Sequence, residues 1–314
     1  MLEFIIISTL NGVTYGLLLF MVSAGLTLIF GMMGVLNFAH ASFYMLGAYI
    51  AYSITRTIDF WIGLLVAPLL VGLLGMLVER YLLRRVHRYG HAHELLLTFG
   101  LAFIFEELIK LFYGDFPVNY SMPAYLRFPA FSLFGADYPF YRLFIGLVAI
   151  GMFVLLYILL SRTRVGLVVR AAERLPSMAE ALGHNVPLVF MGVFGVGAAL
   201  AGLGGAVAGA FFPTNPNMAL ELGVIVFVVV VVGGLGSIEG SLVASLMIGV
   251  FSSFAVGLNW SLARLLDLVG LGDWARELGG LMTLTLSSIS GTVPFLLMLI
   301  VLLVRPAGLF GERN

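Results

Sequence analysis

Three polar residues, Asn37, His40 and Tyr44, lie in a stretch that carries hardly a charge between Phe4 and Thr55. Residues three and four apart share one face of a helix, so the three side chains can point the same way. Polar groups at membrane depth are costly unless they pair or line a cavity. The spacing therefore favours a path for a substrate, lined by Asn37, His40 and Tyr44. The alternative is that His40 donates to a carbonyl of a broken helix and only holds a kink.

A second polar group lies in another apolar block. Glu106 precedes Lys110 by four residues, the order that favours an ion pair on one helix. If Glu94 marks a membrane boundary, a rise of about 1.5 Å per residue places Glu106 roughly 18 Å into a hydrocarbon core about 30 Å thick. A carboxylate at that depth is either a functional acid or the structural partner of its lysine.

The sequence lacks the common signatures of a catalytic centre. It offers no Walker-type phosphate loop, no His-Glu-x-x-His motif and no plausible Ser/His/Asp arrangement. It contains no cysteine, which excludes disulfides, thiolate metal sites and a cysteine nucleophile. Its formal net charge is zero, so it lacks the basic surface that nucleic acids bind. We expect no catalytic residue, no metal and no cofactor of its own.

Composition identifies the surroundings in which these residues work. Of 314 residues, 61% are hydrophobic and 10% are charged, with a mean hydropathy of +1.10. No soluble domain tolerates so much apolar surface. Many apolar blocks reach the roughly 20 residues of a spanning helix, unlike the weak alternating pattern of a membrane barrel. We expect an all-α polytopic membrane protein with about eight to ten transmembrane helices in a single domain, residues 1–314.

The apolar blocks predict where the chain crosses. Spans are expected at roughly 4–30, 34–55, 60–79, 94–113, 143–160, 187–212, 220–240, 241–258 and 292–304, with a candidate re-entrant piece at 278–290. Residues 31–55 either cross once or bend and return, and the composition leaves both open.

Basic residues predict the orientation of the chain. They concentrate in two loops, around Arg80 to Arg88 and around Arg162 to Arg174. The positive-inside rule places both loops in the cytoplasm. The loops 114–142 and 259–290 are richer in proline, aspartate and aromatic residues, so we expect them to face outward, and the tail after Arg305 to end inside.

Glycines interrupt two of the apolar blocks in a similar way. Residues 31–47 read GMMGVLNFAHASFYMLG, and a related stretch, VGGLGSIEGSLVASLMIG, places Gly233 at the counterpart of Gly31, 202 positions later. Such repeated, Gly-interrupted segments are typical of transporters, because a broken helix exposes polar backbone near the midplane. The alternative is that the glycines only let helices pack closely. We predict repeat-like halves of about 1–160 and 187–314, with helix breaks at Gly31, Gly34, Gly233, Gly234 and Gly236.

The polar segment 161–186 separates these halves. Pro176 can open a short helix, because its missing N–H is not needed in a first turn. Gly183 can close that helix in a left-handed cap, and Pro187 can start the next span. The segment is either an amphipathic helix with an alanine face that lodges in a groove of a partner, or an ordinary charged loop that fixes topology.

The order and spacing of four stretches resemble a known family. Together they look like the signature stretches of the branched-chain amino acid ABC transporter permeases, the LivH-like subunit family, over nearly the whole chain. At Ala41 and Glu221 the chain departs from the usual pattern of that family. The four stretches are Asn11 to His40, Leu95 to Gly114, Arg170 to Val186 and Val232 to Gly249.

This resemblance implies how the segment 161–186 works. It is similar to the EAA-type coupling loop that docks on an ATP-hydrolysing subunit. The residues that the resemblance assigns to that contact are Arg170, Ala171, Glu173, Glu180, Ala181 and Gly183.

The resemblance also implies a function and partners. The chain is expected to be the permease subunit of an ATP-driven importer with the ABC importer permease fold. It would move branched-chain or other hydrophobic amino acids, or related small organic acids or amides, across the bacterial inner membrane. Its expected partners are a homologous permease, two ATPase subunits that bind the ATP, a periplasmic substrate-binding protein and the membrane lipid.

Two other classes of protein compete with this interpretation. A passive channel or an ion-coupled secondary transporter would use Glu106 or Glu239 as its coupling acid. An intramembrane enzyme would need a nucleophile, a base and oxyanion donors, and no such set can be placed in the sequence.

Overall fold

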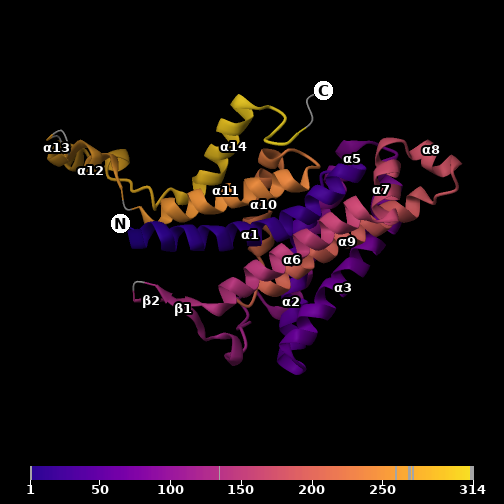
Figure 1. Ribbon diagram of the computed structural model, residues 1–314, viewed down its shortest axis with the longest axis horizontal. Helices are drawn as coiled ribbons and strands as arrows, with labels where there is room; N and C mark the ends of the chain where they lie inside the picture. Colours follow the sequence, from indigo (N-terminus) through magenta and orange to yellow (C-terminus); the bar gives the residue numbers. More distant parts are fainter. Residues whose placement is uncertain (1, 134, 259, 268–269, 271, 312–314) are drawn as a thin grey trace.

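The protein is built almost entirely from long apolar helices (Figure 1). The computed structural model describes residues 2–133, 135–258, 260–267, 270 and 272–311. The long helices are α1 (Leu2–Met33), α2 (His40–Thr57), α3 (Phe60–Val78), α5 (His91–Tyr113), α6 (Phe140–Arg162), α9 (Val186–Ala208), α10 (Met218–Gly233), α11 (Ile238–Gly257) and α14 (Val293–Val304). The expected all-α polytopic architecture is confirmed, and five of these helices (α1, α3 extended to His87, α6, α9 and α11) are long and apolar enough to cross a membrane.

Short elements connect the long helices. A π-turn η1 (Glu79–Leu83) and α4 (Arg84–His87) follow α3. A 3-10 turn η2 (Ala124–Leu126) and a hairpin of β1 (Pro129–Leu133) with β2 (Ala136–Pro139) precede α6, and α7 (Arg164–Arg174) and α8 (Pro176–Ala181) follow it. Between α11 and α14 lie α12 (Leu262–Leu266), α13 (Gly272–Leu278), η4 (Gly280–Met282) and η5 (Ser290–Thr292).

Two antiparallel helix pairs form the frame of the molecule. α1 packs against α11 so closely that a methyl group on Gly16 would come within 2.7 Å of the Ser245 carbonyl oxygen. Further along the same pair, the buried hydroxyls of Thr27 and Ser241 are 2.6 Å apart. α3 packs against α9 in the same manner, since a methyl group on Gly72 would lie 3.0 Å from the Gly195 carbonyl oxygen. Small residues allow this approach where lipid supplies no hydrophobic driving force between helices.

The chain turns back after α1 instead of crossing again. α1 ends at Met33, and Gly34 takes a left-handed φ of +64°. Residues 34–39 return beside α1, and α2 begins where the His40 Nε2 atom lies 2.9 Å from the Val22 carbonyl oxygen. At 1.5 Å per residue, Val22 lies about 16 Å below the end of α1. The segment 31–55 therefore bends and returns, and α2 is a half-helix that starts inside the molecule.

The chain also turns back after α9, in the opposite direction. α1 and α9 are antiparallel, because Val22 lies against Gly204 and Ile29 against Gly197. Residues 209–217 return from the end of α9, and α10 begins at Met218, 178 positions after the start of α2. The local hydrogen bonds match at this offset. The Asn37 side chain accepts from the Ala39 N–H at 3.1 Å, and the Asn215 side chain accepts from the Asn217 N–H at 2.9 Å. The helices α1–α2–α3 and α9–α10–α11 thus form an inverted repeat.

This repeat differs from the one indicated by the glycine-rich stretches. Gly31 and Gly34 lie between α1 and α2, whereas Gly233, Gly234 and Gly236 lie between α10 and α11. The two stretches are not equivalent in the fold. They contact each other instead, since a methyl group on Gly31 would lie 3.1 Å from the Gly236 Cα atom. The sequence likeness reflects the shared need of both stretches for close packing and tight turns.

Polar loops gather at two ends of the molecule (Figure 1). We call one the basic end. It holds residues 79–90, 163–185, 234–237 and the tail 305–311, and the Phe310 N–H donates to the Gly233 carbonyl at 3.0 Å. The positive-inside rule predicts that this end faces the cytoplasm.

The opposite end holds the start of α1, the β-hairpin and the connection from α11 to α14. There Tyr120 anchors its loop, because the hydroxyl donates to the Ala206 carbonyl at 2.9 Å, and burial raises the pKa of this phenol to about 12. The candidate re-entrant piece 278–290 contains the end of α13, 3-10 and hydrogen-bonded turns, and an isolated β-bridge from Thr285 to Ser261. Leu286 donates to the Trp260 carbonyl at 2.7 Å, which holds this segment to the start of its own loop.

Candidate functional site

A pocket opens where the two half-helices begin. It has a volume of about 160 Å³ and lies between α1, the first turn of α2, α5 and the first half of α10. The positive ends of the α2 and α10 dipoles lie beside it, an arrangement that favours a negative or electron-rich group of a ligand. The lining residues are Leu26, Leu36, Asn37, Phe38, His40, Ala41, Ser42, Phe99, Ala102, Phe103, Glu106, Ala219, Leu220, Gly223, Val224, Val226 and Phe227.

Asn37 and His40 line this pocket, and each has a buried polar atom without a hydrogen-bond partner among the described residues. Both side chains are buried, with 4% and 1% of their surface exposed. The His40 Nε2 atom contacts the Val22 carbonyl, which leaves Nδ1 without a partner, and the Asn37 Nδ2 atom also lacks one. Buried polar groups are ordinarily hydrogen-bonded, so these two atoms are candidates for contacts with a ligand.

Glu106 lines the same pocket, with its charge balanced. The Lys110 ammonium lies 2.7 Å from Glu106 and 2.9 Å from Glu107, so the ion pair indicated by the spacing is present. The Glu106 side chain is 9% exposed, whereas that of Glu107 is 69% exposed. The pocket therefore contains a carboxylate that is already paired with a lysine of its own helix.

Tyr44 does not line this pocket. It is buried one turn further along α2, where its backbone carbonyl lies against Gly205. Of the three residues predicted for a path, the structure brings Asn37 and His40 together and places Tyr44 above them, towards the opposite end.

Aromatic rings form the apolar wall of the pocket. The Phe38 and Phe227 rings stack at a centroid distance of 6.2 Å, and Phe38 meets the edge of Phe99 at 6.3 Å. The sequence analysis missed this wall, because a phenylalanine inside an apolar span carries no signal of its own. Only the folded chain shows that rings from α5 and α10 meet at one place.

The predicted helix-break residues lie at the basic end. Gly34 has open space around it, so its left-handed backbone alone demands glycine. Gly234 combines a φ of +103° with a close approach of the tail at Gly311. Gly31 and Gly233 have ordinary backbone angles and serve close packing, while Gly236 combines a φ of +89° with its contact to Gly31.

The segment 161–186 folds into two short helices that project from the basic end (Figure 1). Pro176 stands in the first turn of α8, and Gly183 follows that helix with a φ of +87°. Ala172 and Ala179 are buried against the body of the protein. All six residues assigned to a coupling contact are exposed: Arg170, Ala171 and Glu173 in α7, Glu180 and Ala181 in α8, and Gly183 after it.

Helices α7 and α8 together form a helical hairpin, which we call the hairpin below. Three of its large apolar residues are also exposed. Leu175, Met178 and Leu182 expose 57%, 60% and 75% of their surface. The sequence analysis missed them, since it weighed the alanines and charges of the segment alone. Apolar side chains in this position are typical of a surface that docks on another protein.

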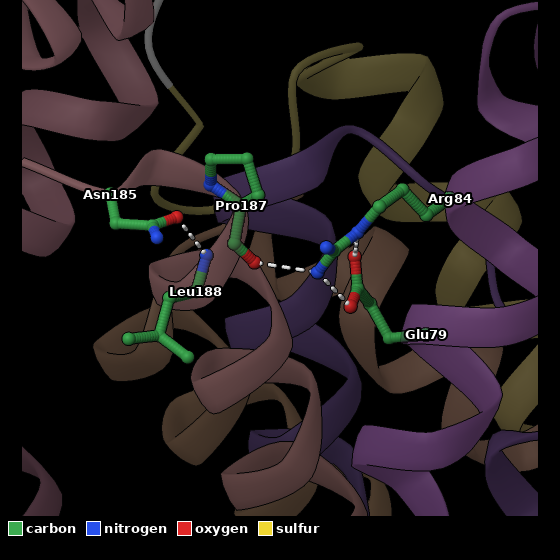
Figure 2. A network of polar contacts seen from close by, with 5 residues as sticks. All are labelled: Glu79, Arg84, Asn185, Pro187 and Leu188. Atoms are coloured by element: carbon green, nitrogen blue, oxygen red, sulfur yellow. Dashed lines mark hydrogen bonds and ion pairs between the residues drawn. The ribbon is translucent and has the colours of Figure 1, made fainter.

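A polar network fixes the base of the hairpin (Figure 2). Arg84 donates to both carboxylate oxygens of Glu79, at 3.0 and 2.7 Å, and to the Pro187 carbonyl at 2.7 Å. The Asn185 side chain accepts from the Leu188 N–H at 3.1 Å and so caps α9. Glu79 is only 1% exposed, and Arg84 is the cation that pairs with its carboxylate. The network ties the loop after α3 to the first turn of α9, next to the hairpin.

Comparisons with known proteins identify the family of the chain. The family model described as the permease component of branched-chain amino acid transport systems matches residues 8–302. The high-affinity branched-chain amino acid transport system permease proteins LivH of Salmonella typhimurium and BraD of Pseudomonas aeruginosa are each 26% identical to the chain. The match covers 96% of this chain and 94% of each relative.

Two further proteins are similar to the chain. LivH of Escherichia coli K12 is 26% identical over 325 residues. The solved structure of PsaBC from Streptococcus pneumoniae in complex with Fab is 13% identical, with a TM-score of 0.48 over 96% of this chain and 92% of that one. Since the family model spans nearly the whole sequence, the chain belongs to the permease components of branched-chain amino acid transport systems.

Proposed function

We propose that this protein is the permease subunit of an ATP-driven importer of branched-chain or similar hydrophobic amino acids. The observation that carries the proposal is the pocket at the starts of α2 and α10. It combines two unpartnered polar atoms, on Asn37 and His40, with an aromatic wall. A small amphipathic molecule fits such a pocket, because its polar group can lie at the two helix ends while its apolar side chain contacts the rings.

The partners follow from what the chain lacks and what it exposes. Its sequence has no nucleotide-binding motif, so ATP-driven transport needs separate ATPase subunits. The exposed apolar residues Leu175, Met178 and Leu182 on the basic-end hairpin are suited to dock such a subunit. The full assembly would contain a second, homologous permease, two ATPases and a periplasmic binding protein, in the bacterial inner membrane.

The arrangement of the acids argues against an ion-coupled carrier. A coupling acid must lie buried on the path and change its charge during the cycle. Glu106 is buried but paired with Lys110, and Glu239 is exposed at the basic end. Neither acid offers the isolated, buried carboxylate that coupling to protons or sodium ions requires.

Uptake by the reconstituted assembly tests the proposal. Vesicles containing the chain and its partner subunits receive the loaded binding protein and radiolabelled leucine, with ATP clamped inside and ion gradients dissipated. Uptake under these conditions is expected, and it should stop when ATP is replaced by a non-hydrolysable analogue. Uptake that needs a proton or sodium gradient, and ignores ATP, would establish the ion-coupled carrier instead.

A further inference from the structure

A second cavity lies at the opposite end of the molecule. Its volume is about 490 Å³, and it lies between α1, the start of α6, the segment after α9, α10, α11 and the start of α14. Its polar lining consists mainly of hydroxyl and amide groups, from Ser8, Asn11, Thr14, Ser252, Ser253 and Ser290. None of its lining residues is acidic.

Arg142 is the charged group of this cavity. The guanidinium donates to the Asn11 side chain and lies over two rings, at 5.5 Å from the centre of Tyr138 and 5.4 Å from that of Phe211. These contacts fix its position. Within the described part of the chain it forms no ion pair, and its Nε atom is buried without an acceptor.

An unpaired, partly buried guanidinium is energetically costly unless an anion completes it. Its planar fork matches the two oxygens of a carboxylate, which it can bind through two parallel hydrogen bonds. A second unsatisfied group lies in the same cavity, since the Ser252 hydroxyl is buried and has no partner in the described residues. The residues around the cavity therefore include an unpaired cation and an unpartnered hydroxyl, with apolar walls from Phe212, Ile225 and Pro294.

Helix α1 runs past both cavities. Tyr15 lines the second cavity, and Leu26, three turns further along the same helix, lines the pocket described above. The two cavities therefore lie one after the other along α1, from the opposite end towards the half-helix ends.

We propose that the cavity around Arg142 is an entry site that binds the α-carboxylate of the incoming amino acid, before the molecule reaches the pocket at α2 and α10. This inference rests on the proposed import of hydrophobic amino acids and adds the group by which the substrate is first held. The carboxylate would bind the guanidinium, and the aliphatic side chain would lie against Phe212 and Pro294.

Thiol protection in the complete assembly tests this site. The chain has no native cysteine, so Ser253→Cys provides a unique thiol in the cavity wall. Its labelling by a membrane-impermeant maleimide is followed in vesicles, with leucine or leucinamide as the probe. Leucine should slow the labelling, and leucinamide, which lacks the carboxylate, should not. Equal effects of the two probes would overturn the proposal.

Arginine variants in the Ser253→Cys background separate this site from other causes. Arg142→Gln should raise the leucine concentration for half-protection by about tenfold or more, because it removes charge-assisted hydrogen bonds. Arg142→Lys keeps the charge and should retain part of the protection. The control Arg127→Gln removes an exposed arginine of the loop that precedes α6 and should change nothing. If Arg142→Gln does not fold, the lysine variant and the comparison of probes still decide.

The remaining outcomes assign the cavity differently. A lipid phosphate could also meet the guanidinium, so the vesicles are made either with phosphatidylglycerol or with phosphatidylcholine alone. Slow labelling that depends on phosphatidylglycerol and ignores leucine would identify a lipid headgroup and refute the entry site. Protection by leucine without ATP-driven uptake would overturn the proposed function but not the entry site. ATP-driven uptake without protection by leucine would overturn the entry site but not the proposed function.

Discussion

His40 joins two structural roles in one side chain. Its Nε2 atom holds the start of α2 to the Val22 carbonyl, while Nδ1 remains available at the pocket. His40→Gln keeps a donor of similar reach and should retain most of the uptake. His40→Leu leaves the Val22 carbonyl without this donor, at a cost of about 1–3 kcal/mol, and should impair uptake.

Uptake and melting temperature, measured together, separate the two roles of His40. A fall in both for His40→Leu indicates a held kink, and a fall in uptake alone indicates a lined path. Normal uptake by the leucine variant at normal expression would contradict both interpretations.

The glycine after α1 allows a matched comparison of backbone effects. Gly34 and Gly151 both have open space around them, but only Gly34 has a left-handed φ. Gly34→Ala should destabilise the protein by about 1–2 kcal/mol and lower uptake, because an alanine strains that backbone. Gly151→Ala lies within α6 and should be neutral or stabilise the helix by up to about 1 kcal/mol.

Thermal unfolding in detergent and uptake in vesicles measure both glycine variants. If Gly34→Ala and Gly151→Ala behave alike, the turn after α1 does not depend on its backbone conformation.

At the scale of elements, the network beneath the hairpin supports a double-mutant test. Arg84→Ala leaves the buried Glu79 carboxylate without its cation and should destabilise the protein by about 1–3 kcal/mol. Adding Glu79→Gln should restore much of that loss, because an amide needs no cation. Arg85→Ala, which removes an exposed neighbour, is the control.

Melting temperatures of the wild type, Arg84→Ala, Glu79→Gln and the double variant give the coupling energy of the Arg84–Glu79 pair. Equal losses for Arg84→Ala alone and for Arg84→Ala with Glu79→Gln would show that the carboxylate is satisfied elsewhere.

The hairpin itself carries a prediction about assembly. Ala181 is exposed, so Ala181→Arg should leave insertion and the melting temperature unchanged. A bulky charge on the docking surface should instead detach the ATPase subunits. Co-purification of the ATPase and substrate-stimulated hydrolysis measure this directly, and normal values of both would remove the hairpin from the interface.

At the scale of the whole molecule, sequence pattern predicted the helices but not their relation to one another. Apolar blocks of spanning length mark α3, α5, α6 and α9 within a few residues, because burial in lipid acts on each block separately. The inverted repeat was missed, since its two halves share hydrogen-bond geometry at Asn37 and Asn215 but little sequence. The glycine likeness pointed to a different pairing, because close packing and tight turns demand glycine wherever they occur.

The sequence likewise predicted only part of the candidate site. Polar residues in apolar spans, such as Asn37 and His40, stand out in the sequence because their burial is costly. The aromatic wall and the cavity around Arg142 do not stand out, because they depend on which helices meet. Distances along the chain cannot supply that information.

The inverted repeat predicts which parts of the molecule move. α1 and α11 touch through glycine backbone along much of their length, so this pair should act as a rigid unit. α2 and α10 start from irregular segments and meet at the pocket, where a methyl group on Gly223 would lie 3.0 Å from the Ala41 Cβ atom. Opening the pocket to one end and then the other requires these half-helices to separate.

Cross-linking can test this division, because the chain has no native cysteine. A disulfide between Ala41→Cys and Gly223→Cys should stop uptake, and a reductant should restore it, since the Cβ atoms are close to the distance that such a bond needs. The control pair, Thr27→Cys with Ser241→Cys, replaces hydroxyls 2.6 Å apart within the rigid unit and should leave uptake intact when oxidised. Uptake that survives the first cross-link would show that the half-helices stay together through the cycle, and uptake lost only with the second would place the movement between α1 and α11.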